Sequence, residues 1–174
     1  MFVAWYTFEM GARMTQMLVP IEAEANPQVV KLFYDMAYLQ ARRDAGMVIS
    51  SEEADQLASL QNIMGGDPTY HRRRFRRLPI QMIVKVRIHS QEDEAQVLNM
   101  SAGGFYLSSP IEAKAGEPLQ VKVEAGDGAL YTFPCVVCRA DCDRDACRLA
   151  VTFEGIPLEV RRGAVTDEPL SAAG

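Results

Sequence analysis

The spacing of hydrophobic residues changes at residue 79, and this change most limits the folds open to the chain. In the stretch PIQMIVKVRIHS, every second side chain is apolar: Ile80, Met82, Val84, Val86 and Ile88. Such alternation is typical of a strand with one buried face. Five more strand-like segments follow, separated by turns: AQVLNMS, GFYLSSP, EPLQVKVEAG, ALYTFPCVVCRAD and CRLAVTFEG. Six short strands with tight turns predict a small antiparallel β-barrel.

Residues 1–66 have helical rather than strand periodicity. Trp5, Phe8, Ala12 and, further along, Met17 fit one broad apolar stripe that Pro20 interrupts, so the opening segment is expected to be helical. A second helix is expected to start with Asn26 as N-cap and Pro27 in the first turn, and to stop at Gly46. The apolar face of this helix comprises Val30, Phe33, Ala37 and Leu39, with Val29 and Met36 beside it.

A third helix is expected in SSEEADQLASLQNIM. Ser50 and Glu53 have the spacing of a capping box, in which each side chain bonds the other residue's backbone N–H. The buried face of this helix is expected to contain Ala54, Leu57, Leu60 and Met64. The GGDP stretch at 65–68 should then end it.

These patterns predict an α+β protein with a helical N-terminal segment followed by a six-stranded antiparallel barrel. The expected boundaries are a helical region at 1–66, an arginine-rich hinge at 67–78, a barrel at 79–157 and a short, frayed C-terminal tail at 158–174. At 174 residues with 48% hydrophobic content, the chain is long enough to bury a substantial core.

The hinge concentrates positive charge in a chain that is otherwise acidic. Five of the six residues from Arg72 to Arg77 are arginine, with Phe75 between them, whereas the net charge of the whole chain is −5. That balance argues against nucleic-acid binding across the whole surface. The cluster is therefore either a solvated linker or a local site for an anion.

A second motif follows about twenty residues later, in NMSAGG at 99–104. Asn99 and Ser101 are two residues apart, so on a strand they project from the same face. Gly103 and Gly104 permit a tight turn. Taken alone, this composition is ordinary for a hairpin turn.

Together, the two motifs resemble those of the PilZ domain, a family of bacterial receptors for cyclic di-GMP. The family pattern RRxxxR is matched by Arg72, Arg73 and Arg77, followed by Leu78 and Pro79. The pattern [D/N]xSxxG is matched by Asn99, Ser101 and Gly104. The resemblance covers roughly residues 70–155, on the expected strand pattern.

The resemblance implies how these residues would hold cyclic di-GMP. Arg73 and Arg77 would bind its phosphates and guanines, and Arg72 would add a contact that favours a stacked pair of ligand molecules. Guanidinium groups suit this task because they pair bidentately with phosphate or with the O6/N7 edge of guanine.

On the barrel, Asn99 and Ser101 would hydrogen-bond the ligand, and Gly104 would keep the surface open. Arg74 and Arg76 have no assigned role in the family. The resemblance therefore divides the site between a basic loop and a polar strand end.

Four cysteines, at 135, 138, 142 and 147, lie close enough in sequence to suggest zinc. However, Cys135 and Cys138 should face opposite sides of a strand, whereas Cys142 and Cys147 could lie opposite each other across a hairpin. We therefore expect no metal site, and small buried or oxidation-prone thiols instead. No signal peptide or membrane span is apparent, so we expect a cytoplasmic protein with reduced cysteines.

The leading functional hypothesis is a non-enzymatic cyclic di-GMP effector that controls motility, surface polysaccharide or biofilm formation. No catalytic constellation and no cofactor motif is apparent in the sequence. The N-terminal helices are the expected surface for a protein partner or a homodimer. The alternatives are a PilZ-like protein–protein adaptor that does not respond to cyclic di-GMP, and a nucleic-acid-binding module, which the sparse positive charge elsewhere disfavours.

Overall fold

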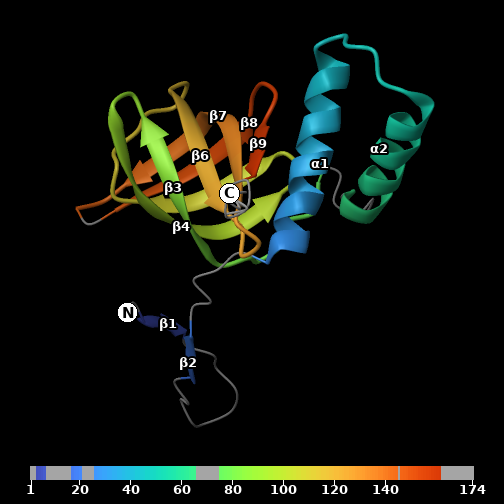
Figure 1. Ribbon diagram of the computed structural model, residues 1–174. Helices are drawn as coiled ribbons and strands as arrows, with labels where there is room; N and C mark the ends of the chain where they lie inside the picture. The colour runs from blue at the N-terminus through green and yellow to red at the C-terminus, as the bar shows by residue number, and fades with distance from the viewer. Residues whose placement is uncertain (1–2, 7–16, 21–25, 66–74, 145, 162–174) are drawn as a thin grey trace, which may run out of the picture.

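The computed structural model describes residues 3–6, 17–20, 26–65, 75–144 and 146–161, with side chains from residue 26 onward. Its centre is an antiparallel barrel (Figure 1). The strands are β3 (Met82–Ile88), β4 (Gln91–Ser101), β5 (Gly104–Ser109), β6 (Pro118–Glu124), β7 (Ala129–Cys142) and β8 (Cys147–Phe153). They pair in the order β6-β3-β4-β5-β8-β7, and pairing of β6 with β7 closes the ring. The predicted six-stranded barrel is confirmed.

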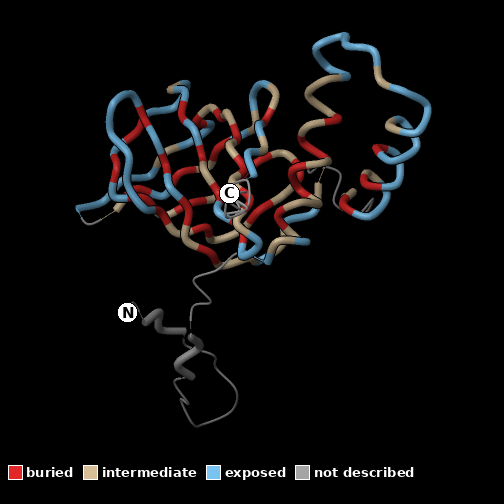
Figure 2. The backbone as a smooth tube through the Cα atoms, in the orientation of Figure 1, coloured by how far each residue is buried: buried red, intermediate tan, exposed pale blue. Residues whose placement is uncertain are grey.

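The barrel interior is filled by the residues that alternate along each strand. On β3, Met82, Val84, Val86 and Ile88 are buried, as predicted, and Ile80 just before the strand is half-buried. The red positions in Figure 2 follow the same alternation around the ring. Phe133 and Tyr131 of β7 are the largest of the fully buried side chains in the barrel. The wall therefore has a packed, apolar inner face and a more polar outer one.

A seventh strand, β9 (Leu158–Arg161), extends the sheet beyond the closed ring. It pairs with the first residues of β7, in register Ala129↔Arg161 to Thr132↔Leu158. The expectation of a frayed tail is therefore wrong for residues 158–161. The short apolar alternation of Leu158 and Val160 was too brief to be recognised, and β7 is long enough to offer an edge that β8 does not use.

Two helices precede the barrel: α1 (Pro27–Asp44) and α2 (Ser51–Met64). The side chain of Asn26 caps α1 by accepting hydrogen bonds from the backbone N–H groups of Gln28 and Val29. Ser50 and Glu53 form the predicted capping box on α2. No helix in the described part of the chain is long and apolar enough to cross a bilayer.

Helix α1 lies against the barrel, and α2 lies on the side of α1 that faces away from it (Figure 1). The Tyr34 ring of α1 contacts Tyr131 of β7, with the ring centroids 5.0 Å apart. The predicted face of α1 is buried, including Val30, Phe33 and Leu39. Helices and barrel therefore share one apolar core.

The predicted face of α2 is correct except at one position. Leu57, Leu60 and Met64 are buried, but Ala54 is exposed. Ala54 lies in the first turn, near the loop that connects the helices, so α1 does not cover it. Helix α2 is therefore attached by three buried side chains, together with the Arg42–Glu53 ion pair and a hydrogen bond from Gln61 to Gln40.

The expected first helix is wrong where the structure describes it. Val3–Tyr6 (β1) and Met17–Pro20 (β2) pair as antiparallel strands, from Val3↔Pro20 to Tyr6↔Met17. Valine and aromatic residues favour strands, and Pro20 cannot continue a helix. The remaining residues of the expected helix, including Phe8 and Ala12, lie outside the described residues.

The cysteines divide as their spacing predicted. Cys135 is buried in β7, whereas Cys138 is exposed. Cys142 and Cys147 are opposite each other in the β7–β8 ladder and form a disulfide. The expectation of reduced cysteines is wrong for this pair, because direct cross-strand register holds the two sulfur atoms together. No group of three or more His, Cys, Asp or Glu side chains among the described residues could hold a metal ion.

Candidate functional site

The second motif lies at the tight turn that joins β4 to β5. The backbone N–H of Gly103 donates to Ser101 Oγ over 3.3 Å, and the same hydroxyl donates to the Gly104 carbonyl over 3.4 Å. Thr152 Oγ1 of β8 donates to the Gly103 carbonyl over 3.0 Å. The turn is thus held both by its own serine and by the neighbouring strand.

Gly104 is required at its position by the close approach of β8. A Cβ atom there would lie 1.9 Å from the Val151 carbonyl oxygen and 2.9 Å from Thr152 Cα. Its φ of 154° is also a conformation that residues with a Cβ rarely adopt. The predicted role for Gly104 was an open surface, and the structure adds a steric requirement of the barrel itself.

Asn99 and Ser101 lie two residues apart on β4, on the outer wall of the barrel. Met100 between them is fully buried, so the two polar side chains face outward, and both are half-buried. A β-bulge between Val97 and Asn99 shifts the register, so that Asn99 pairs with Tyr106. No other described residue hydrogen-bonds the Asn99 amide. We call Asn99, Ser101 and the adjoining Gly103 and Gly104 the polar ledge.

Part of the arginine motif lies directly beside the polar ledge. Leu78 and Met100 form an antiparallel bridge, with hydrogen bonds of 2.8 and 3.0 Å between their backbone groups. In an antiparallel pair, the residue before Leu78 lies opposite the residue after Met100. Arg77 and Ser101 are therefore neighbours. Arg76 and Arg77 are exposed, and neither forms an ion pair with another described residue. Arg72 and Arg73 lie outside the described residues.

Phe75 is a contact residue that the sequence did not indicate. A Cβ atom on Gly103 would lie 3.2 Å from Phe75 Cδ2 and 3.6 Å from Cε2, so the ring lies against the polar ledge. Phe75 also bridges to Gly65, and the Arg76 N–H donates to the Met64 carbonyl over 3.1 Å. Residues 75–78, which we call the arginine segment, are therefore attached to both the barrel and the end of α2. One aromatic residue among arginines was the only available signal.

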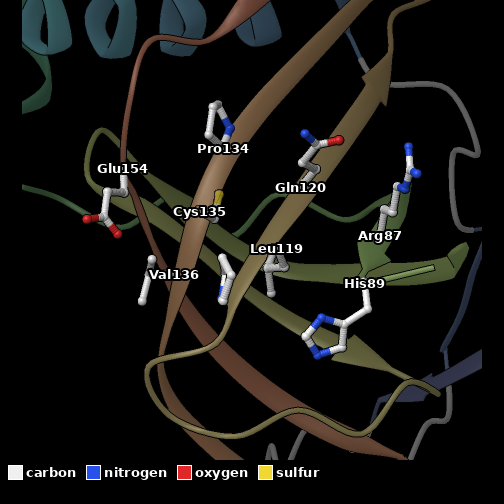
Figure 3. Close-up of a pocket in the computed structure, with 9 residues that line it drawn as sticks. Arg87, His89, Leu119, Gln120, Pro134, Cys135, Val136 and Glu154 are labelled. Carbon is white, nitrogen blue, oxygen red and sulfur yellow. The ribbon is translucent and has the colours of Figure 1, made fainter. Parts of the chain in front are cut away.

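An open pocket of about 570 Å³ lies on another part of the wall, over β3, β6 and β7 (Figure 3). Arg87 and His89 stand on one side of it and Glu154 on the other, with Pro134 and Val136 of β7 between them. None of the predicted site residues lines this pocket. It therefore adds no support to the predicted site.

Comparison with protein families identifies the domain to which the barrel belongs. The PilZ domain model matches residues 71–165, which is more than half of the chain and includes both motifs. The protein therefore belongs to the PilZ domain family, which in general comprises cyclic di-GMP-binding effectors. No curated protein matches the sequence.

Proposed function

We propose that this protein is a non-enzymatic effector that binds cyclic di-GMP between its arginine segment and the polar ledge. The observation that carries the proposal is the Leu78–Met100 bridge, which sets Arg77 next to Ser101. The bridge supports the proposal because one arginine of the first motif, Arg77, lies beside Ser101 of the second on the outer wall of the barrel.

The chemistry of these groups suits a cyclic dinucleotide. The Arg77 guanidinium is exposed and is available to pair with a phosphate or the guanine O6/N7 edge. The Asn99 amide offers both a donor and an acceptor to a base edge. Arg73 would provide the second guanidinium, and Arg72 a further contact that favours two stacked ligand molecules. Gly104 would leave the wall flat where the ligand lies.

The output would pass through the helices. Because the Arg76 N–H bonds the last residue of α2 and Phe75 bridges Gly65, a shift of the arginine segment pulls on the end of that helix. We call the state with the arginine segment held against the barrel the closed arrangement. Ligand would shift the protein toward this arrangement only as far as it binds the closed arrangement more tightly than the open one. The surface so changed would contact a protein partner or a second copy of the chain. Motility, surface polysaccharide and biofilm formation are the proposed outputs.

Isothermal titration calorimetry with cyclic di-GMP tests the proposal. Arg77→Ala and Arg73→Ala should each weaken binding by roughly tenfold or more, because a charge-assisted hydrogen bond contributes about 1.5–3 kcal/mol. Arg144→Ala is the matched control, since Arg144 is an exposed arginine at the β7–β8 hairpin. Its affinity should equal that of the wild type. Absence of wild-type binding would leave a PilZ adaptor without a cyclic di-GMP response, and retained affinity in both variants would refute the residue assignment.

A further inference from the structure

We propose that Phe75 is a positioning residue, whose ring anchors the arginine segment on the polar ledge and prepares it for ligand. The inference rests on the proposed function, since it concerns how that same site reaches its affinity. Neither family motif includes Phe75 among its defining positions, which are arginines, Asn99, Ser101 and Gly104.

The contact follows from the register of the arginine segment on β4. The antiparallel bridge pairs Leu78 with Met100, and three positions further along each chain stand Phe75 and Gly103. The aromatic ring lies over the bare Cα of Gly103, at a distance that leaves no comfortable room for a methyl group. Phe75 is half-buried and packs against the hydrophobic core. A glycine is therefore the natural partner for the ring.

The same anchor lies midway between the two arginines that the motif pairs. Phe75 is two residues after Arg73 and two before Arg77. Because a chain spans at most about 3.6 Å per residue, the Arg77 Cα atom must stay within about 7 Å of the Phe75 Cα. Contact of Phe75 with Gly103 and the bridge of Leu78 to Met100 thus hold the backbone on both sides of Arg77 beside the polar ledge.

The Phe75 ring would raise the affinity for ligand without contacting the ligand itself. A loop that is already held in place loses less conformational freedom on binding, so more of the contact energy appears as affinity. Without the ring, the segment would keep its backbone contacts to Met100 of β4 and to the end of α2, but would lose its side-chain contact with the polar ledge. The ligand would then have to order the arginines itself, and affinity should fall.

A double-mutant cycle in cyclic di-GMP binding tests the anchor. Phe75→Ala should lower affinity about tenfold, and Phe75→Leu, which keeps apolar volume, should lower it less. Gly103→Ala should also lower affinity several-fold, because its methyl group displaces the ring. In the Phe75→Ala background, Gly103→Ala should have almost no further effect. The methyl group then has no ring to displace, and the next nearest atom is Ser101 Oγ at 3.9 Å.

Hydrogen exchange separates anchoring from general stability. The Arg76 amide, which bonds the Met64 carbonyl, should exchange faster in Phe75→Ala, while amides of β5 and β8 remain protected. Ile83→Ala is the control, since Ile83 is a half-buried residue on β3 away from the contact, and it should leave affinity unchanged.

Three outcomes would be decisive. If the wild type binds and Phe75→Ala binds equally well, the anchor is wrong although the proposed function stands. If the two substitutions add in full, Gly103 acts independently of the ring, and the inference also fails. If the wild type binds no cyclic di-GMP, the proposed function itself fails, and with it the inference.

Discussion

The barrel and the helical pair are held together in very different ways. In the barrel, all six strands pair on both edges along at least part of their length, and the interior is filled by fully buried side chains such as Phe133 and Val97. Helix α2, in contrast, buries only Leu57, Leu60 and Met64. Each such side chain contributes about 1.5–3 kcal/mol when it is fully buried. The difference indicates that the barrel has a continuous packed interior, whereas α2 depends on three buried side chains together with the Arg42–Glu53 ion pair and the Gln61–Gln40 hydrogen bond.

This contrast matters because the arginine segment touches both regions. It bridges β4 through Leu78 and contacts the end of α2 through Arg76. Under the proposed function, a ligand that tightens this segment against the barrel would act directly on the end of α2. If the contrast holds, the barrel wall should resist local changes, and α2 should unfold without the barrel.

The largest effect is expected from Gly104→Ala. The added methyl group would meet the Val151 carbonyl at 1.9 Å, so β5 and β8 must separate. We expect the free energy of unfolding to fall by about 3 kcal/mol or more, because backbone atoms cannot rotate aside as a side chain can. Urea denaturation of the variant and the wild type measures the loss.

Gly116→Ala is the matched control for backbone conformation. Gly116 has a φ of 88°, but a Cβ atom there would have no neighbour within 4 Å. It should therefore lose only about 1–2 kcal/mol from the unfavourable φ. Equal losses in the two variants would show that the β5–β8 approach is not tight and that the wall can adjust.

Much of the fold could be predicted because its signals are local. The alternation on β3 and the caps Asn26 and Ser50 are each set by residues within a few positions of one another. The N-terminal strands and β9 were missed for the opposite reason. Each has only four residues, too few for a period to be recognised, and β9 depends on an edge of β7 that the sequence does not reveal.

The candidate site could be predicted only in part. Its two motifs were visible, and the strand pattern placed Asn99 and Ser101 on one face of the wall. The contacts that join the motifs could not be predicted, because they depend on tertiary register. Thr152, about fifty residues from Gly103, supplies a hydrogen bond to the turn that nothing in its local sequence indicates.

A smaller and local effect is expected from Ser50→Ala. The Glu53 N–H donates to Ser50 Oγ over 3.1 Å, and the Ser50 N–H donates to the Glu53 carboxylate over 2.7 Å. Loss of such a cap typically costs about 1 kcal/mol. If α2 is as independent as the comparison suggests, hydrogen exchange should speed up in α2 while amides of β3 and β4 stay protected.

Ser59→Ala, on the exposed side of α2, controls for the loss of a hydroxyl. Its Oγ donates only to the Asp55 carbonyl one turn earlier, so stability should change by less than about 0.5 kcal/mol. If Ser50→Ala instead accelerated exchange throughout the barrel, the helices and the barrel would unfold as one unit, and the proposed movement of α2 would lose its basis.

The smallest effect is expected from Tyr131→Phe, at the interface between the two regions. The Tyr131 side chain is fully buried, and its hydroxyl has no hydrogen-bond partner among the described residues. Burial raises the pKa of this phenol, since the charged form cannot be hydrated there. Removing an unpaired buried hydroxyl relieves a desolvation penalty and leaves only a small void. The variant should therefore be as stable as the wild type, or more stable by up to about 1 kcal/mol.

Thermal unfolding of Tyr131→Phe and of the wild type measures the effect. Tyr106→Phe, which changes a half-buried tyrosine on β5, is the control. Both variants should unfold within a few degrees of the wild type. A clear loss of stability in Tyr131→Phe alone would mean that its hydroxyl is hydrogen-bonded in solution, for instance through a buried water molecule. Helix α1 would then be fastened to the barrel by a polar contact as well as by the Tyr34 ring, and movement within the helical region would have to begin at α2.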